Sequence, residues 1–198
     1  MCGIVGYWSE TNFSNDVIKI MCDQIRHRGP DAQSAWSDKA RGLFLGHRRL
    51  SILDLSDAGK QPMTSSCGRY TIVFNGEIYN HLELRNLLSQ KWGDINWRGH
   101  SDTETLLNCV VYNGIDATLQ LLNGMFALAL FDKKHNEITL ARDRAGEKPL
   151  YFGYVNKTFF FGSELKALKC HPAWDGEINQ NAIASYLRHN YVPAPLSI

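Results

Sequence analysis

The sequence has no long hydrophobic run and no excess of charge of either sign. Its longest uninterrupted apolar stretch is Met125–Phe131, far below the roughly 18 residues that a membrane-spanning helix needs. Lysine and arginine number 21 against 20 aspartate and glutamate residues, a net charge of +1. A nucleic-acid or anionic-membrane partner would favour a strong basic excess. We therefore expect no nucleic acid and no membrane as partners.

The chain also lacks the paired cysteines of a disulfide or zinc framework. Its five cysteines are far apart in sequence and form no Cys-x-x-Cys pair. This pattern predicts reduced thiols and no metal site. The N-terminus does not resemble a signal peptide, because no basic flank precedes Gly3–Gly6 and Glu10 follows closely. We therefore expect a cytoplasmic location.

Length and composition favour one globular domain. The 198 residues are 44% hydrophobic and 21% charged, and a chain of this size buries roughly 70% of its unfolded surface without a metal or disulfide. We expect the domain to span residues 2–190. The tail over residues 191–198 carries Pro193 and Pro195 and resembles the start of a linker to a further domain.

Helical spacing of apolar residues predicts helices in four segments. Asn80 with Glu83, and Ser101 with Glu104, have the pattern of a capping box. The predicted helices, with the residues expected to face the core, are Asn15–Ile25 (Val17, Met21, Ile25), a helix from Asn80 (Leu84, Leu87, Leu88), a helix from Ser101 to Gly114 (Leu106, Leu107, Val110, Val111), and Gln180–His189 (Ile183, Tyr186, Leu187).

Strand patterns fill the segments between these helices. Asp132–Asn136 and Asn156–Lys157 are typical of hairpin turns, so the strands that flank them should be antiparallel. Phe126–Phe131 is apolar at successive positions, which predicts a sheet covered on both faces. The predicted strands are Ile4–Trp8, Leu43–His47, Tyr70–Phe74, Phe126–Phe131, Ile138–Arg142, Leu150–Val155 and Thr158–Phe161. The pattern indicates a layered domain of helices and sheets.

Cys2 is the first candidate for chemistry. A small residue after the initiator methionine lets an aminopeptidase remove Met1 and leave Cys2 as the new N-terminus. A terminal cysteine places an α-amine, of ordinary pKa about 7.7–8.0, beside a thiol of ordinary pKa about 8.5. Such an amine activates the neighbouring nucleophile. Taken alone, a cysteine at this position more often has no catalytic role and is only a small residue at the start of the first strand.

Short motifs at fixed places along the chain decide between these interpretations. In order they are Met1–Gly6, Arg26–Asp31, His47–Ile52, Asn75–Asn80, Ser101–Glu104, Gly124–Ala127, Ala141–Arg144 and Lys148–Tyr151. Together they closely resemble the N-terminal glutaminase domain of the asparagine synthetase B family, a class II glutamine amidotransferase. Two other branches, the glucosamine-6-phosphate synthases and the amidophosphoribosyltransferases, share the Cys-Gly opening but are less similar elsewhere.

The resemblance implies an α+β fold, the N-terminal nucleophile (Ntn) hydrolase fold. It is a four-layer αββα sandwich of two antiparallel sheets between helices. It also implies that Cys2 attacks the side-chain amide of glutamine, releases ammonia and leaves a γ-glutamyl thioester that water cleaves. The side chain of Asn75 and the backbone N–H of Gly76 match the oxyanion hole of that family. An Asn-Gly pair is by itself typical of a type I′ turn, but here a helix and not a returning strand is expected to follow.

The resemblance also assigns a glutamine pocket. Arg49 would bind the α-carboxylate, for which its planar guanidinium is suited, and Asp102 would bind the α-ammonium with help from Glu77. The segment Leu50, Ser51, Ile52 and Leu53 would line the pocket through its backbone. By themselves, Arg49 suits a surface salt bridge and Asp102 suits a helix N-terminus.

The remaining polar motifs have structural interpretations. We expect Arg26–Asp31 to be a loop that braces the site, Arg48 to form a surface salt bridge, and Arg142, Asp143 and Arg144 to form internal ion pairs or an interface to a following domain. His27 and His47 have no partner residues at the spacing that a metal site needs, so we expect both to be structural. Core positions are expected for Cys22, Cys109, Phe126, Phe131, Tyr154, Phe159, Phe160 and Phe161.

No nucleotide-binding motif is present. The chain has neither Gly-x-x-x-x-Gly-Lys-Ser/Thr nor the Ser-Gly-Gly-x-Asp-Ser of the family's synthetase domain. The resemblance therefore implies no cofactor here, and ATP and magnesium only in a C-terminal synthetase domain that would receive the ammonia. Aspartate is the expected acceptor of the ammonia, and sugar, cell-wall or antibiotic acceptors remain alternatives. A homodimer is also an open alternative.

Two other functions are weighed against glutamine hydrolysis. A catalytically silent interaction domain should lack Cys2, Asn75 or Asp102. A hydrolase of another amide should lack the Arg49–Asp102 pair. The sequence has all of these residues.

Overall fold

Two antiparallel sheets form the centre of the computed structural model, which describes residues 1–11, 13–51, 56–193 and 196. The five-stranded sheet has the order β2-β3-β1-β9-β8 and the four-stranded sheet the order β4-β5-β6-β7. The strands are β1 Gly3–Ser9, β2 Ala32–Asp38, β3 Leu43–Arg49, β4 Met63–Thr64, β5 Tyr70–Ile78, β6 Gly124–Asp132, β7 Glu137–Arg142, β8 Tyr151–Val155 and β9 Thr158–Gly162.

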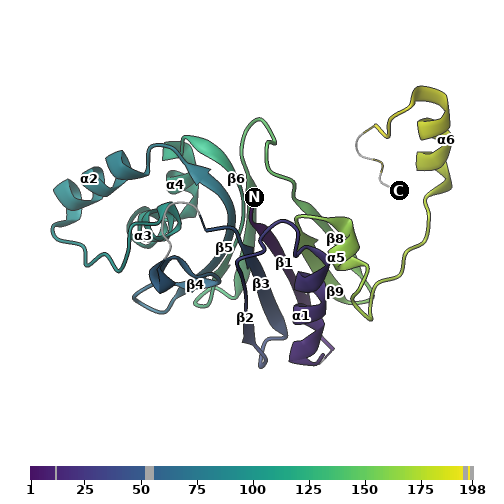
Figure 1. Cartoon of the computed structure of the whole chain (residues 1–198), viewed down its shortest axis with the longest axis horizontal. Coiled ribbons are helices and arrows are strands. Elements are labelled where there is room, and N and C mark those ends of the chain that lie inside the picture. Colours follow the sequence, from purple (N-terminus) through teal and green to yellow (C-terminus); the bar gives the residue numbers. More distant parts are fainter. Residues whose placement is uncertain (12, 52–55, 194–195, 197–198) are drawn as a thin grey trace.

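Helices cover the outer face of each sheet (Figure 1). Helices α1 and α5 pack on the five-stranded sheet, and α2, α3 and α4 lie over the four-stranded sheet. The helices are α1 Asn15–Gln24, α2 His81–Trp92, α3 Asp102–Asn113, α4 Ile115–Leu121, α5 Leu165–Leu168 and α6 Gln180–His189, with a 3₁₀ turn, η1, at Asp57–Gly59. None of the helices in the described ranges is long and apolar enough to cross a bilayer.

Alternation of side chains along each strand builds the layers. On β6, Phe126, Leu128 and Leu130 pack with α2 and α3, whereas Ala127, Ala129 and Phe131 face the other sheet. Because successive strand residues point to opposite faces, a strand buried on both sides must be apolar throughout. The predicted double coverage of Phe126–Phe131 is confirmed.

The five-stranded sheet follows the same rule. Val5 and Tyr7 of β1 pack with α1, whereas Ile4 faces the four-stranded sheet together with Leu45 of β3 and Phe161 of β9. The order of layers is therefore helices, sheet, sheet, helices. The predicted four-layer αββα sandwich is confirmed.

Both predicted hairpins are present. Strands β6 and β7 pair antiparallel across Lys133–Asn136, and β8 and β9 pair across Asn156–Lys157. Asn156 and Lys157 have φ angles of 47° and 60°, the conformation that a two-residue type I′ turn requires. The predicted strands are all present, most of them longer by a few residues.

Four short or polar elements were not predicted. Strand β2 has the sequence Ala-Gln-Ser-Ala-Trp-Ser-Asp and is only partly buried, because it is an edge strand. Strand β4 has two residues, and helices α4 and α5 have seven and four. Periodicity needs longer windows than these to indicate an element.

Several side chains predicted to face the core are exposed. Leu87 lies on the flank of α2, whose buried contacts come from Leu84 and Leu88. Tyr154 is exposed because β8 is an edge strand. Tyr186 and Leu187 are exposed because α6 stands apart from both sheets (Figure 1).

His47 connects the two sheets. Its imidazole is buried on β3, and Nε2 donates a hydrogen bond to the carbonyl oxygen of Phe74 on β5, at 3.2 Å. A carbonyl only accepts, so Nε2 carries the proton. Burial, opposed in part by the hydrogen bond to Phe74 and assisted by the cation of Arg49, lowers the pKa of His47 from 6.5 to about 4. The imidazole is therefore neutral in the folded protein at neutral pH.

Acidification should destabilise the protein through His47. The unfolded chain takes up this proton near pH 6.5 and the folded chain only near about 4, so stability falls as pH drops through that window. We expect a cost of about 2 kcal/mol at about pH 5 relative to neutral pH. His47→Gln keeps an N–H donor and should remove the His47 share of this dependence in denaturant unfolding, whereas His171, whose pKa burial also lowers to about 4, keeps its own share. His189→Gln, at an exposed histidine, should leave the dependence as in the wild type, and equal slopes for all three proteins would contradict the assignment.

Candidate active site

One cavity of about 100 Å³ gathers residues from both sheets and from α3. It lies where β1 begins, where β3 ends and where β5 approaches α3. In the view of Figure 1 the N-terminus lies between the two sheets, and Met1 is 57% exposed there. The lining residues are Met1, Cys2, His47, Arg49, Leu50, Gly59, Gln61, Phe74, Asn75, Gly76, Glu77, Ser101, Asp102, Thr103, Met125 and Lys148.

The Cys2 thiol is held against the backbone that follows β3. The N–H of Leu50 donates to Sγ at 3.4 Å, and Sγ lies 3.5 Å from the Leu50 carbonyl oxygen. Burial raises the pKa of the Cys2 thiol, and the Leu50 hydrogen bond and the Arg49 charge oppose this rise in part. A thiolate here therefore needs a base and nearby positive charge.

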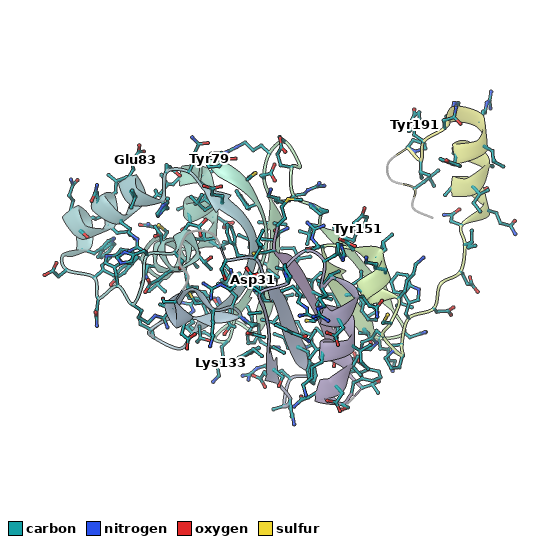
Figure 2. All side chains as sticks on the ribbon, viewed as in Figure 1. Asp31, Tyr79, Glu83, Lys133, Tyr151 and Tyr191 are labelled. Carbon is teal, nitrogen blue, oxygen red and sulfur yellow. The ribbon has the colours of Figure 1, made fainter. Side chains whose placement is uncertain are left out.

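The Arg26–Asp31 loop braces this arrangement. Arg28 Nε donates to the carbonyl oxygen of Cys2 at 3.0 Å, and its Nη1 lies 2.9 Å from Glu164 Oε1. Burial would raise the pKa of Glu164, but hydrogen bonds from Arg28, His27 and Lys166 outweigh it and hold that pKa at about 2. The exposed Asp31, which is labelled near the middle of the view in Figure 2, accepts a hydrogen bond from the Ser51 N–H at 2.8 Å through its carboxylate.

Alternation along β3 separates two neighbouring arginines. Arg49 is an even number of residues from Leu45 and His47, so its side chain points to the same face of β3 as theirs. It therefore faces the four-stranded sheet and lines the cavity. Its Nη1 donates to the Ser56 carbonyl at 3.0 Å. Arg48 points to α1 and pairs with Asp23. The prediction of a surface salt bridge for Arg48 is wrong in one respect: its side chain is buried, and only Asp23 is exposed.

Asn75 offers an unused donor to the cavity. It lies on β5 and points to the same face as Val73, so its side chain faces the five-stranded sheet near the beginning of β1. The residue is buried, and its Nδ2 has no hydrogen-bond partner in the described part of the chain. A buried amide without a partner costs free energy, so a bound acceptor would stabilise this group.

The backbone of Gly76 points to the same place. The Tyr79 N–H donates to Asn123 across the β5–β6 pair, so odd-numbered residues of β5 bond to β6 and even-numbered ones point away. The Phe74 N–H accordingly reaches Gln61 at 2.6 Å, and the Ile78 N–H reaches Asp102 at 2.9 Å. Gly76 N–H therefore lies on the free edge of β5 between these two contacts.

The requirement for glycine at position 76 comes from the neighbouring strand. A Cβ there would lie 2.2 Å from the Met125 carbonyl oxygen and 2.7 Å from the Phe126 Cα. Glycine at this position thus allows the close approach of β6 to β5. Asn75-Gly76 lies within β5, so the type I′ turn is excluded.

Asp102 is a buried carboxylate at the first residue of α3. Its oxygens accept from the Ile78 N–H at 2.9 Å and the Thr103 N–H at 2.8 Å. Burial raises its pKa, these two hydrogen bonds oppose the rise, and the charge of Glu77 adds to it. A cationic ligand would lower the pKa again and keep the carboxylate charged.

The two predicted capping boxes differ in the structure. Ser101 Oγ accepts from the Glu104 N–H at 3.2 Å, as expected, but the Glu104 carboxylate binds the N–H groups of Arg98 and Gly99 instead of returning to Ser101. Asn80 makes no side-chain cap. Its amide binds the backbone of Leu121 and Asn123 instead.

The structure thus brings most of the predicted site residues together. Ser51 is not among the described residues that line the cavity, and its N–H is taken by Asp31. Ile52 and Leu53 lie outside the described residues. The residues brought together are Cys2, Arg49, Leu50, Asn75, Gly76, Glu77 and Asp102.

Sequence reasoning missed several polar residues of the cavity, among them Gln61 and Lys148. Gln61 accepts from Phe74 and donates to Thr103 Oγ1 at 3.2 Å, so it ties β5 to α3. Lys148, interpreted as part of a turn, is buried in the cavity wall. No periodic or motif signal marks Gln61, whereas Lys148 lies in a quoted motif.

The arginines and the aspartate before Lys148 bind backbone groups. Asp143 accepts from the N–H groups of Phe126 and Lys148, each at 3.1 Å. Arg142 donates to the carbonyl of Lys148, and Arg144 to that of Leu122. The predicted ion pairs among these residues are not formed in the described ranges. An interface to a following domain stays a prediction.

The family follows from a match over the whole chain. The family model described as "Glutamine amidotransferase domain" matches residues 1–198. The chain belongs to this family. The similarity to asparagine synthetases that the motifs indicated is confirmed by the relatives of this glutamine amidotransferase domain.

The relatives are longer proteins. The chain is 38% identical to asparagine synthetase [glutamine-hydrolyzing] 1 of Bacillus subtilis over all of its length and 31% of that protein. It is 36% identical to a putative asparagine synthetase [glutamine-hydrolyzing] 2 of Methanocaldococcus jannaschii, over 41% of that protein. The amidotransferase domain therefore spans about a third of the length of these relatives.

A solved structure has the same fold. Glutamine phosphoribosylpyrophosphate amidotransferase from B. subtilis superposes with a TM-score of 0.71 over 85% of this chain and 43% of its own, at 19% identity. The predicted Ntn hydrolase fold of the amidotransferase domain is confirmed by this likeness. Within the described ranges, no three His, Cys, Asp or Glu side chains are placed to hold a metal ion.

Thiol labelling should distinguish two cysteines of the amidotransferase domain. Cys67 is exposed, and the hydrogen bond to Ser65 lowers its pKa, whereas burial raises that of Cys2. The thiolate is the reactive form. In a chain that retains Met1, iodoacetamide at mildly alkaline pH should label Cys67 before Cys2, as peptide mass mapping would show. Cys67→Ser should remove the fast phase, and first labelling at Cys2 would contradict the described environment.

Proposed function

We propose that this domain hydrolyses L-glutamine to L-glutamate and ammonia, with Cys2 as the nucleophile. The observation that carries the proposal is the cavity itself. It unites the Cys2 thiol, the unpartnered buried amide donor of Asn75, the Arg49 cation and the buried Asp102 carboxylate. A free amino acid with a side-chain amide matches this set, because it offers a carbonyl, an α-carboxylate and an α-ammonium.

The proposed chemistry begins after Met1 is removed. While Met1 is attached, the Cys2 nitrogen is a peptide nitrogen and cannot accept a proton. Once it is free, the α-amine takes the thiol proton, and the sulfur attacks the amide carbon of glutamine. The carbonyl oxygen becomes an oxyanion, which the Asn75 amide and the Gly76 N–H are placed to bind.

Collapse of this intermediate breaks the carbon–nitrogen bond. The α-ammonium returns its proton to the leaving nitrogen, and ammonia departs from a γ-glutamyl thioester. Water then attacks the thioester carbon, gives a proton to the α-amine and forms a second oxyanion in the same place. Cleavage of the carbon–sulfur bond releases glutamate and restores Cys2.

Arg49 and Asp102 are proposed to orient the substrate. A guanidinium binds a carboxylate through two parallel hydrogen bonds, and Asp102, with Glu77, would receive the α-ammonium. Both residues lie in the wall of the cavity that contains Cys2. This placement supports glutamine over an amide with an apolar acyl group.

The whole protein would use the ammonia elsewhere. Relatives named asparagine synthetase extend well beyond this region, so we propose that a C-terminal synthetase domain with ATP and magnesium amidates aspartate. The domain described here would need no cofactor of its own. A thiol nucleophile also suits the reducing cytoplasm, which is the proposed location.

Glutamate release should require a free Cys2 amine and its thiol. A fusion that a protease cleaves directly before Cys2 should be inactive when intact and active after cleavage. Cys2→Ala should be inactive in both forms, because no thioester can form. Coupled detection of glutamate, with intact mass to confirm the N-terminus, measures both. Full turnover by the uncleaved fusion or by Cys2→Ala would refute the assignment.

Asp102→Asn should weaken glutamine binding without unfolding the site. The amide oxygen can still accept one of the two backbone N–H groups that Asp102 binds, which alanine could not. Loss of a charged hydrogen-bond partner should raise the KM for glutamine about tenfold to a hundredfold.

The matched control is Asp116→Asn, in the first turn of α4 and exposed, which should leave the KM unchanged. Labelling of Cys2 by a small alkylating agent should persist in Asp102→Asn. An unchanged KM in that variant would remove Asp102 as the ammonium ligand.

A further inference from the structure

Lys148 is a buried cation in the wall of the Cys2 cavity. It is 5% exposed. Its N–H donates to Asp143 Oδ2 at 3.1 Å, and its carbonyl accepts from Arg142 Nε. The backbone is therefore fixed on both sides, and the side chain extends into the cavity that Cys2, Asn75 and Gly76 line.

The ammonium of Lys148 has only weak partners. Its Nζ lies 3.2 Å from Met1 Sδ and 3.0 Å from Met125 Sδ. No carboxylate of the described residues lies within 4.0 Å of it, whereas other lysines such as Lys19, Lys60 and Lys166 have one. Thioether sulfur is a poor acceptor, and a buried charge without a counter-charge is costly.

Removal of Met1 would change this environment. Met1 is bonded to Cys2, and its sulfur touches Lys148 Nζ. Met1 itself is 57% exposed, so its removal would leave an open space at the edge of the cavity, bordered by the new Cys2 amine, to which Met1 was bonded, and by Lys148 Nζ, which its sulfur contacted. This step rests on the proposed function, which requires the free amine.

We propose that Lys148 is a positioning residue that keeps the Cys2 α-amine unprotonated near neutral pH. A second positive charge close to an amine disfavours its protonated form. A base is most effective when it is free at the working pH. Lys148 would thus act through the amine, without touching glutamine.

Other charged groups around the cavity do not replace Lys148. His47 of β3 is neutral at this pH, since burial lowers its pKa to about 4. Arg49 of β3, Asp102 of α3 and Glu77 of β5 also line the cavity, but these residues are the same in the wild type and in every Lys148 variant, so a difference between these proteins reports Lys148. Arg28 lies against the Cys2 carbonyl and is paired with Glu164.

The test compares pH profiles of kcat/KM for processed wild type, Lys148→Met and Lys148→Arg. In Lys148→Met the acid limb should move up by about one pH unit, which is about a tenfold loss on that limb, while the rates converge at high pH. Lys148→Arg keeps the charge and should follow the wild type. Lys133→Met, an exposed lysine at the other end of β6 (Figure 2), is the matched control.

A second measurement does not depend on turnover. The nitrogen chemical shift of isotope-labelled Cys2 reports the titration of its amine, and its midpoint should rise in Lys148→Met and stay in Lys148→Arg. Intact mass confirms that Met1 is absent from each protein. An unmoved midpoint, or an equal loss of activity at every pH, would overturn the role of Lys148. Absence of glutamate release from the processed wild type would instead refute the proposed function.

Discussion

The free edge of β5 is the constraint on which the site depends. Strand β4 pairs with β5 only at Thr71 and Ile72, so the even-numbered N–H groups beyond them have no neighbouring strand. A buried N–H needs an acceptor, and two side chains from other segments, Gln61 and Asp102, supply acceptors. Gly76 lies between them, and its N–H is left for a ligand. The same hydrogen bonds that satisfy this edge also fix α3 against β5.

Burial between the sheets sets the electrostatics of the cavity. It raises the pKa of the Cys2 thiol and of the Asp102 carboxylate, so it works against the charged form of each. A zwitterionic ligand with a carboxylate near Arg49 and an ammonium near Asp102 would reverse this effect for Asp102 and exclude water. In this arrangement the charges of the ligand complete the cavity, and a neutral or singly charged molecule would leave one group uncompensated.

The parts of the structure predicted from sequence are those fixed by local patterns. Apolar runs such as Phe126–Phe131 indicated strands that are buried on both faces. Successive side chains of a strand point to opposite faces, so a run of apolar residues makes both faces apolar. Motif positions named Cys2, Asn75 and Asp102, and the structure places them in one cavity. Exposure of Leu87 and Tyr186 could not be predicted, because it depends on which face of α2 packs on its neighbours and on the position of α6 away from both sheets. Gln61 was missed because its role arises only when β5 lacks a neighbouring strand.

Strand parity also explains why neighbouring residues of one motif differ in role. Arg48 and Arg49 are adjacent in sequence, but the two faces of β3 give one to Asp23 on the helical layer and the other to the cavity. Lys148 lies outside any strand, so alternation does not decide where its side chain points. It enters the cavity because Asp143 and Arg142 fix its backbone. A motif therefore identifies which residue types occur together, and the geometry of the layers decides which of them meet the nucleophile. For an N-terminal cysteine at the start of a central strand, that geometry places the partly buried chain end at the wall of the cavity, where a nearby positive charge acts on its amine more strongly than it would in bulk water.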